Sequence, residues 1–344
     1  MIGSESIDLS LKNIWKCWFA FKKGKKPSLE LHNFQYNLEK NLYSLFDDLQ
    51  KGQYRHGGYR KFIVKENKKR EISVACLRDR VVHRMVYDHL VKIYDKTFIY
   101  DVWSCRVGKG LLGAIERAQS FLQHTHTHTH THTHTAKPIL RVWKCDVKKF
   151  FDSVDQETLL NILSRRIKDN ITFSLLKEII YSYTSIAGQK IGMPIGNLTS
   201  QIFANIYLNE LDRYVKHHLK PKSYLRYGDD FILVDFDLQK LALFRAKTIE
   251  FLENNLKLQV NKKSDRLIKA TDGLKFLGVI LWPEYSTCRY IRDRPSGRTL
   301  VKRSLDRIKN RLSLANVSSY HGLVYKHASR KDKKRFIWQI LEKI

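Results

Sequence analysis

The chain has 344 residues, and its 43% hydrophobic and 12% aromatic content is enough for a buried core and argues against a disordered protein. Its 63 Lys and Arg against 34 Asp and Glu give a formal charge of +29. This indicates a polyanionic partner, because basic side chains release counterions from phosphate backbones. No apolar run approaches about 18 residues, so we expect no membrane span and no membrane partner. Five scattered cysteines without CxxC spacing favour a reducing cytosol over a disulfide framework or a zinc site.

Hydrophobic periodicity predicts a chain that alternates between helices and short strands. In chain order we expect a helical region over 9–51, strands over 59–64 and 71–75, helices over 79–94 and 108–122, a strand over 139–145, helices over 156–163, 173–183 and 197–218, strands over 224–227 and 231–234, a helix over 241–255, and a strand or strand pair over 274–282. A basic helical tail follows, with 15 Lys and Arg against three Asp between Arg289 and Arg335. Strands and helices around one sheet predict an α+β or α/β body.

One low-complexity segment interrupts this pattern, the six His-Thr pairs of residues 124–135. On a strand, all six imidazoles would lie on one side and could bind a metal ion. The alternative is a repeat expansion at a loop tip, which is tolerated because added loop length costs little free energy. We favour the loop, since no large apolar residue anchors the run and no carboxylate stands beside it to orient a ligand.

Two acidic sites stand out. Asp146 ends an apolar strand, and Asp229-Asp230 lies at the turn of an apolar hairpin. Carboxylates at the ends of buried strands are costly unless they bind metal or water. Two divalent ions are the usual arrangement for phosphoryl transfer on nucleotides, and oxygen ligands select Mg²⁺, with Mn²⁺ as an alternative. Taken alone, Gly-Asp could also be an ordinary hairpin turn.

Six motifs follow one another along the chain: Arg70-Glu-Ile-Ser73, Arg78-Asp79-Arg80, Asp146–Asp152, Gly192–Gln201, the Tyr227-Gly228-Asp229-Asp230 box and Phe276-Leu277-Gly278. In type and order they resemble the motifs of the reverse transcriptases. The resemblance implies an α+β right-hand polymerase fold. Its fingers and an N-terminal helical extension would occupy 1–138, its palm 139–283 with 165–200 partly in the fingers, and its basic thumb 284–344.

The resemblance also assigns the catalytic metal ligands. Asp146 and Asp229 are expected to hold both ions, with the Val147 carbonyl as a further ligand. Asp230 is placed with them, although adjacent residues on extended backbone point to opposite faces. Phe276, Leu277 and Gly278 would form the primer grip. The thumb would bind the template–primer duplex through Lys302, Arg303, Arg307 and Arg311, reading its shape and phosphates.

Other residues are assigned to the incoming nucleotide. Phe151 would stack under the sugar, where a 2′-hydroxyl would clash, so that the product is DNA; the alternative is an ordinary core phenylalanine. Arg70, with Lys65, would hold the triphosphate, because a guanidinium matches phosphate oxygens. Ile195 and Gly196 complete this site.

Ile195 stands where most reverse transcriptases have Gln. A branched apolar side chain cannot hydrogen-bond the nascent base pair, so we expect lower fidelity. The motif Gly192–Gln201, which contains Ile195, resembles that of reverse transcriptases of diversity-generating retroelements, as do the segments 103–110 and 319–322. The resemblance implies cytoplasmic, prokaryotic or phage-encoded synthesis of adenine-mutagenised cDNA from a template RNA, primer strand and dNTPs, with a small basic accessory protein.

Other functions are weighed against this one. An RNA-dependent RNA polymerase is disfavoured, since its first box has an Asp at the place of Phe151. A group II intron enzyme would need a maturase or endonuclease extension, and 66 residues follow Gly278. A defence-associated reverse transcriptase would share the same polymerase core. A non-enzymatic RNA-binding scaffold would not need Asp146 and Asp229.

Overall fold

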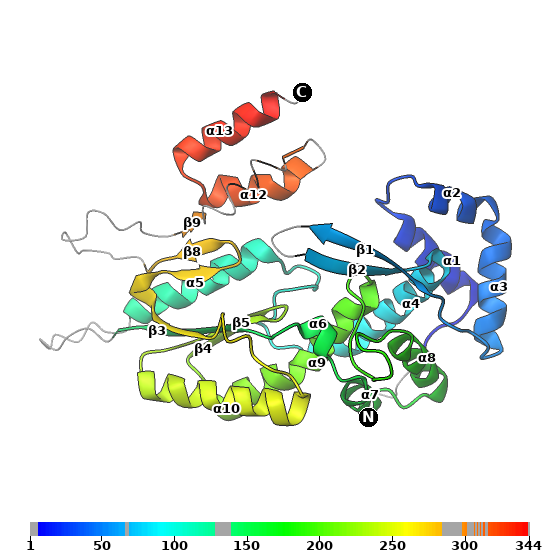
Figure 1. Cartoon of the computed structure of the whole chain (residues 1–344), viewed down its shortest axis with the longest axis horizontal. Helices are drawn as coiled ribbons and strands as arrows, with labels where there is room; N and C mark the ends of the chain where they lie inside the picture. Colours follow the sequence, from blue (N-terminus) through cyan, green and yellow to red (C-terminus); the bar gives the residue numbers. More distant parts are fainter. Residues whose placement is uncertain are drawn as a thin grey trace, which may run out of the picture. The chain divides into compact units, whose positions relative to one another are not determined.

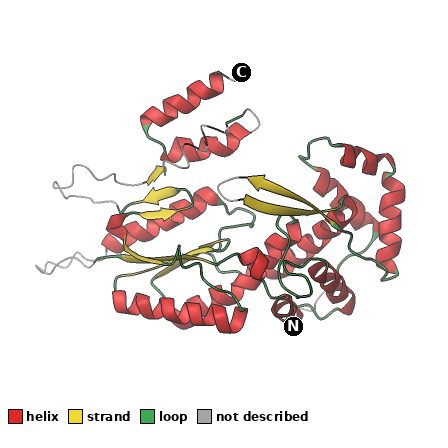
Figure 2. Cartoon of the chain, in the orientation of Figure 1, coloured by secondary structure: helices red, strands yellow, loops and turns green. Residues whose placement is uncertain are grey.

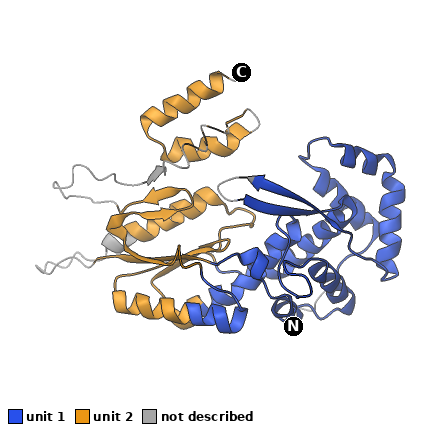
Figure 3. Ribbon diagram, viewed as in Figure 1, with its two compact units in different colours: residues 1–99, 147–214, 249–260 blue, residues 100–146, 215–248, 261–344 orange. Residues whose placement is uncertain are grey.

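The computed structural model describes residues 6–65, 69–127, 139–283, 298–300 and 316–342, and the single positions 306, 308, 310, 312 and 313. The chain forms two compact units, each assembled from separate segments (Figure 3). Unit 1 comprises Met1–Ile99, Val147–Tyr214 and Ile249–Val260. Unit 2 comprises Tyr100–Asp146, Val215–Thr248 and Asn261–Ile344. The division into fingers, palm and thumb stays a prediction.

Unit 1 begins with three helices, α1 (Leu11–Lys22), α2 (Leu29–Tyr36) and α3 (Leu38–Gln50). The predicted helical region over 9–51 thus consists of three separate helices. Gly24 takes a φ of +74°, and the Ser28 side chain accepts from the Leu31 N–H to start α2. The helices bury their apolar faces, with Trp18, Leu42 and Leu45 fully enclosed.

The rest of unit 1 is a hairpin and a group of helices. Its elements are β1 (Tyr59–Lys65), β2 (Lys69–Ala75), α4 (Leu77–Tyr94), the 3₁₀ turn Asp95–Thr97, α6 (Phe150–Ser153), α7 (Gln156–Ser164), α8 (Asn170–Tyr181) and α9 (Leu198–Tyr214). The two strands pair antiparallel from Tyr59↔Ala75 to Lys65↔Lys69. The packing of α4 against both α1 and α9 makes α4 the central helix of the unit.

Unit 2 is built on a four-stranded antiparallel sheet of order β4-β5-β3-β6. Its strands are β3 (Arg141–Asp146), β4 (Ser223–Tyr227), β5 (Asp230–Asp235) and β6 (Arg266–Lys269). β6 was not predicted from the sequence, because it is a largely exposed edge strand with a charged residue at each end. A π-helical turn, Val215–Leu219, precedes β4.

Helices cover both faces of this sheet, with α5 (Leu111–Thr127) on one side and α10 (Leu238–Leu256) on the other (Figure 1). On the α5 face, Val142, Ile232 and Val234 join one buried core with Ile115 and Leu122. On the other face, Asp265 receives the Trp143 indole N–H at 2.8 Å and also pairs with Arg245 of α10. Both faces of β3, β4 and β5 are therefore largely buried, which explains their nearly continuous apolar sequence.

A second, three-stranded antiparallel sheet of order β7-β8-β9 completes the strands of unit 2. It contains β7 (Leu274–Phe276), β8 (Val279–Leu281) and β9 (Arg298–Leu300), preceded by the 3₁₀ turn Ala270–Asp272. Of the two alternatives predicted over 274–282, a strand or a strand pair, the pair is present, whereas β9 lies in the segment predicted as a helical tail and was not predicted. Two helices follow, α12 (Val317–His327) and α13 (Arg330–Leu341). The described elements together have the predicted mixture of helices and sheets (Figure 2). No helix in the described ranges is long and apolar enough to cross a membrane.

Candidate active site

The two acidic motifs meet in the central sheet of unit 2. The ladder between β3 and β5 places Asp146 directly opposite Asp230. Residues paired in this way lie on the same face of an antiparallel sheet, with Cα atoms about 5 Å apart. Asp229 occupies the adjacent turn. The register therefore brings Asp230 beside Asp146, which the alternation argument alone left open.

The turn that carries Asp229 is a two-residue hairpin loop, because Tyr227 pairs with Asp230. Gly228 has a φ of +64°, while Asp229 is not among the residues of positive φ, as in a type II′ turn that favours glycine first. The Gly228 N–H donates to Ser104 Oγ at 2.8 Å, and its carbonyl accepts from Arg226 Nη1 at 2.9 Å. Arg226 is fully buried. The turn is thus held at both polar groups of Gly228.

Asp146 is held by the segment before β6. Its N–H donates to Ser264 Oγ at 3.2 Å, and its carbonyl accepts from the Asn261 N–H at 2.9 Å. Asn261 Nδ2 also donates to Asp146 Oδ2 at 3.2 Å. The other carboxylate oxygen, Oδ1, is buried and has no hydrogen-bond partner among the described residues. A buried carboxylate oxygen is costly without a cation or donor, so Oδ1 is suited to a metal ion.

The carboxylates by themselves do not make a complete metal cage. Within the described part of the chain, no three His, Cys, Asp or Glu side chains are grouped as a ready-made site. Mg²⁺ in nucleotide-processing enzymes is commonly held by one or two carboxylates together with substrate phosphates and water. The pair Asp146 and Asp230, with the unpartnered Oδ1, fits that mode of binding.

The segment predicted as the primer grip is the turn of the β7–β8 hairpin. Phe276 pairs with Val279, so Leu277 and Gly278 form a two-residue loop. Their φ values of +48° and +87° match a type I′ turn. A positive φ is unfavourable for leucine, and strained residues of this kind concentrate at functional positions.

The residues assigned to the nucleotide lie in unit 1, as does Val147, which forms an isolated bridge with Val260. Phe151 is half-buried in α6, whereas Phe150 is buried, so Phe151 keeps part of its ring accessible. The Phe151 carbonyl accepts from the Met193 N–H at 2.7 Å.

The 195–197 segment is fastened to β2. The Ile195 carbonyl accepts from the Ser73 N–H at 2.9 Å, and the Asn197 side chain donates to the Ser73 carbonyl at 2.7 Å. Gly196 has a φ of +113°, and a Cβ there would lie 2.7 Å from Ile72 Cγ2. Only glycine allows this close approach without displacement.

Arg70 is an exposed residue of β2, two positions before Ile72 and hence on the same face of the hairpin. Ile72 is the residue that a Cβ at position 196 would approach most closely. Arg70, Ile195 and Gly196 therefore belong to one local arrangement. Lys65 is the last residue of β1 and pairs through its backbone with Lys69.

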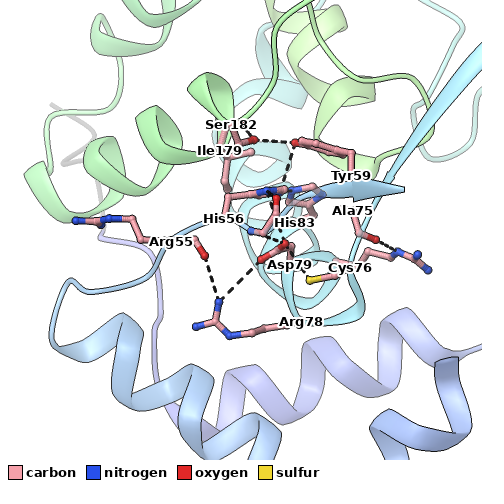
Figure 4. Close-up of polar contacts among 12 residues, drawn as sticks. Arg55, His56, Tyr59, Ala75, Cys76, Arg78, Asp79, His83, Ile179 and Ser182 are labelled. Carbon is pink, nitrogen blue, oxygen red and sulfur yellow. Dashed lines mark hydrogen bonds and ion pairs between the residues drawn. The ribbon is translucent and has the colours of Figure 1, made fainter. Parts of the chain in front are cut away.

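The Arg78-Asp79-Arg80 motif contributes to a polar cluster in the first turn of α4, centred on Asp79 (Figure 4). Asp79 is fully buried and accepts from the Tyr54 hydroxyl at 2.8 Å and the Gly57 N–H at 2.9 Å. His56 and His83 meet through their Nε2 atoms at 3.0 Å. Burial, followed by the charge of His56, lowers the pKa of His83 to about 3. The cluster ties the chain before β1 to α4.

A basic pocket of about 260 Å³ opens in unit 1 beside the 196–198 segment. Its lining residues are Ala20, Phe21, Lys23, Lys25, Arg80, His83, Arg84, Gly196, Asn197 and Leu198. Arg80 lies 3.5 Å from Glu30 and Arg84 donates to Asp88, whereas Lys23 and Lys25 have no carboxylate partner among the described residues. Both lysines are exposed, and Lys25 Nζ lies 5.3 Å from the centroid of the Phe21 ring.

Lys302, Arg303, Arg307 and Arg311 lie outside the described residues, as do positions 128–135 of the His-Thr run. The first residues of that run extend α5 as far as Thr127.

Several residues that support the site carry by themselves no motif by which the sequence would have identified them. Asn261 and Ser264 stand in a polar segment without a recognisable pattern. Ser104 lies inside the recognised segment 103–110 and Arg226 directly precedes the Tyr227–Asp230 box, and those positions were the available signal. The hydrogen bonds of Asn261, Ser264 and Ser104 join residues more than 100 positions apart, and that of Arg226 lies within the β4–β5 hairpin. Hydrophobic periodicity predicts neither kind of bond.

Comparison with known proteins settles the family. The family described as "Reverse transcriptase (RNA-dependent DNA polymerase)" matches residues 60–281, from β1 to the end of β8. This chain belongs to the reverse transcriptase family. It is accordingly an RNA-directed DNA polymerase, and the predicted fold is confirmed.

Relatives share parts of this polymerase region. Protein YkfC of Escherichia coli is 26% identical over 282 residues, covering 71% of this chain and 72% of YkfC. The group II intron-encoded protein LtrA of Lactococcus lactis is 34% identical over 74 residues, covering 20% of this chain and 12% of LtrA. The telomerase structure from Candida albicans has a TM-score of 0.51 at 12% identity, covering 71% of this chain and 48% of that one. This reverse transcriptase therefore spans about half of the telomerase chain and a small part of LtrA.

Proposed function

We propose that this reverse transcriptase synthesises cDNA with two Mg²⁺ ions at Asp146, Asp229 and Asp230. The observation that carries the proposal is the buried, unpartnered Oδ1 of Asp146 in a strand pair that sets Asp146 opposite Asp230. When bound, the ions would activate the primer 3′-hydroxyl and stabilise the leaving pyrophosphate, with the Val147 carbonyl as a further ligand. The clamped Gly228 turn would keep Asp229 in a fixed orientation.

The substrate roles fall to other residues. Arg70 and Lys65 bind the triphosphate, and the accessible ring of Phe151 excludes a ribose 2′-hydroxyl. Phe276, Leu277 and Gly278 hold the primer end. The template RNA is bound through its phosphates, for which the basic pocket with Lys23 and Lys25 is suited. The thumb residues Lys302, Arg303, Arg307 and Arg311 contact the duplex.

The cDNA is error-prone and serves to diversify a target gene, with errors concentrated opposite template adenine. Ile195 supports this step of the proposal, because its half-buried side chain has no polar atom and its carbonyl is already bonded to Ser73. Base discrimination then depends on shape and stacking. A template RNA and a small basic accessory protein would be the partners, in a prokaryotic or phage setting.

A second candidate is a defence-associated or other prokaryotic reverse transcriptase with the same chemistry, without errors directed at adenine. Similarity to the intron-encoded LtrA favours it. Sequencing of cDNA made from a defined RNA distinguishes the two. Errors concentrated opposite adenine support diversification, and a low, uniform error rate supports the second candidate.

Primer extension on an RNA template tests the catalytic assignment. Asp146→Asn, Asp229→Asn and Asp230→Asn should each lower the rate by about a thousandfold, an amount typical for loss of a group that stabilises transition-state charge. Template–primer binding should persist. Asp272→Asn, which alters an exposed carboxylate in the same unit, is the matched control and should extend normally. Full activity in all three variants would refute the proposal.

A further inference from the structure

Lys144 is a cation beside the carboxylates to which the proposed mechanism gives no task. It lies two residues before Asp146 on β3, and therefore on the same face of the sheet. Its Nζ is 3.8 Å from Asp230 Oδ1. The same Nζ donates to the Lys275 carbonyl of β7 at 3.0 Å. One ammonium group thus contacts the catalytic hairpin and the strand that leads into the predicted primer grip.

The two neighbouring carboxylates give the Lys144 ammonium an electrostatic role. Like charges directly opposite each other destabilise a sheet, and Asp146 faces Asp230 in this way. Lys144 places a positive charge beside the pair before any metal ion arrives. The bond to Lys275 restrains the flexible side chain, so the ammonium stays near the carboxylates.

We propose that Lys144 positions Asp230 in the metal-free enzyme and that a divalent ion displaces its ammonium from this carboxylate. The inference rests on the proposed metal-dependent function. An ammonium and a divalent cation repel each other at one carboxylate, so Lys144 lowers the affinity of the free enzyme for Mg²⁺. The metal then binds firmly when the phosphates of a nucleotide add negative charge. Lys144 is a positioning residue and couples metal binding to substrate binding.

Direct Mg²⁺ titration of the full chain by calorimetry, without nucleic acid, tests this role. Lys144→Gln removes the charge but can still donate to the Lys275 carbonyl. We expect it to bind Mg²⁺ about fivefold more tightly than the wild type, from the loss of one repelling charge nearby. Lys144→Arg keeps the charge and should bind Mg²⁺ like the wild type. In EDTA, Lys144→Gln should melt at a lower temperature, and Mg²⁺ should raise its Tm more than that of the wild type.

Lys240, near the start of α10, offers a matched control, because its partner Asp235 is the last residue of β5. Its Nζ also lies 3.8 Å from a carboxylate oxygen, Asp235 Oδ2. Lys240→Gln should leave the Mg²⁺ affinity unchanged. Wild-type affinity in Lys144→Gln, or in Lys144→Met should the first variant not fold, would overturn the inference and leave the proposed function standing. A wild type that binds no Mg²⁺ with or without template–primer and dNTP would contradict the proposed function itself.

Discussion

The Gly228 N–H donates to Ser104 Oγ at 2.8 Å, although 124 residues separate the two positions. This bond joins the turn that carries Asp229 to the loop before α5. Ser104 is buried, so the hydrogen bond forms away from competing water. The loop is thereby a structural support of the candidate active site.

Removing this hydroxyl should slow catalysis. Ser104→Ala leaves the Gly228 N–H without this acceptor, a loss of about 1 kcal/mol. Because Ser104→Ala loosens the turn that carries Asp229, kcat should fall about fivefold while KM for template–primer stays the same. Steady-state primer extension measures both constants. Ser120→Ala is the control, since Ser120 donates to the Arg117 carbonyl within α5; an equal effect in both variants would contradict a role in the turn.

Replacing Ile195 tests the origin of low fidelity. Ile195→Gln introduces a side chain that can hydrogen-bond the nascent pair, and such a contact contributes about 1–3 kcal/mol of discrimination. Errors opposite template adenine should therefore fall by about 10- to 100-fold. Deep sequencing of cDNA from one RNA template measures the rate. Ile195→Leu keeps an apolar side chain and should retain the wild-type errors; an unchanged spectrum in Ile195→Gln would disprove this explanation.

The basic pocket of unit 1 makes a salt-dependent prediction. Lys23→Gln with Lys25→Gln removes two cations that have no carboxylate partner among the described residues. Binding to single-stranded RNA should weaken, and the slope of log K against log salt should flatten by about 1.4. Fluorescence anisotropy over a salt series provides the measurement. Lys12→Gln changes an exposed lysine at the start of α1, away from the pocket lining, and should have a smaller effect. Equal slopes in the double variant and in Lys12→Gln would exclude the pocket as an RNA-binding site.

The buried His83 predicts acid sensitivity of unit 1. Its pKa is lowered from 6.5 to about 3, chiefly by burial, so the unfolded state binds a proton that the folded state excludes. Stability from this residue is present above pH 6.5 and is lost as the pH falls below it. Between pH 7 and pH 5 the free energy of unfolding should drop by about 2 kcal/mol. Urea denaturation at the two pH values measures this change.

A substitution at His83 separates its contribution from that of other groups. His83→Gln, which does not titrate, should reduce the difference in stability between pH 7 and pH 5. The exposed His32 of α2 is the control, and His32→Gln should keep the wild-type difference. An undiminished difference in His83→Gln would show that His83 does not cause the acid sensitivity.

The sequence by itself determined the elements and the chemistry of the candidate site. Asp146 ends an apolar strand, and Gly228 begins a two-residue turn, because short-range patterns of burial and backbone freedom are written in neighbouring residues. The motifs and their order along the chain were sufficient to identify the resemblance to reverse transcriptases. Most helices and strands followed from the same periodicity.

Only the tertiary structure decided which carboxylate faces Asp146. The strand register depends on a ladder between residues more than 80 positions apart, and a shift of one residue would have set Asp229 there instead of Asp230. The bonds from Asn261 to Asp146 and from Lys144 to Lys275 likewise join distant segments. Such contacts arise when the whole unit packs, so no local pattern encodes them.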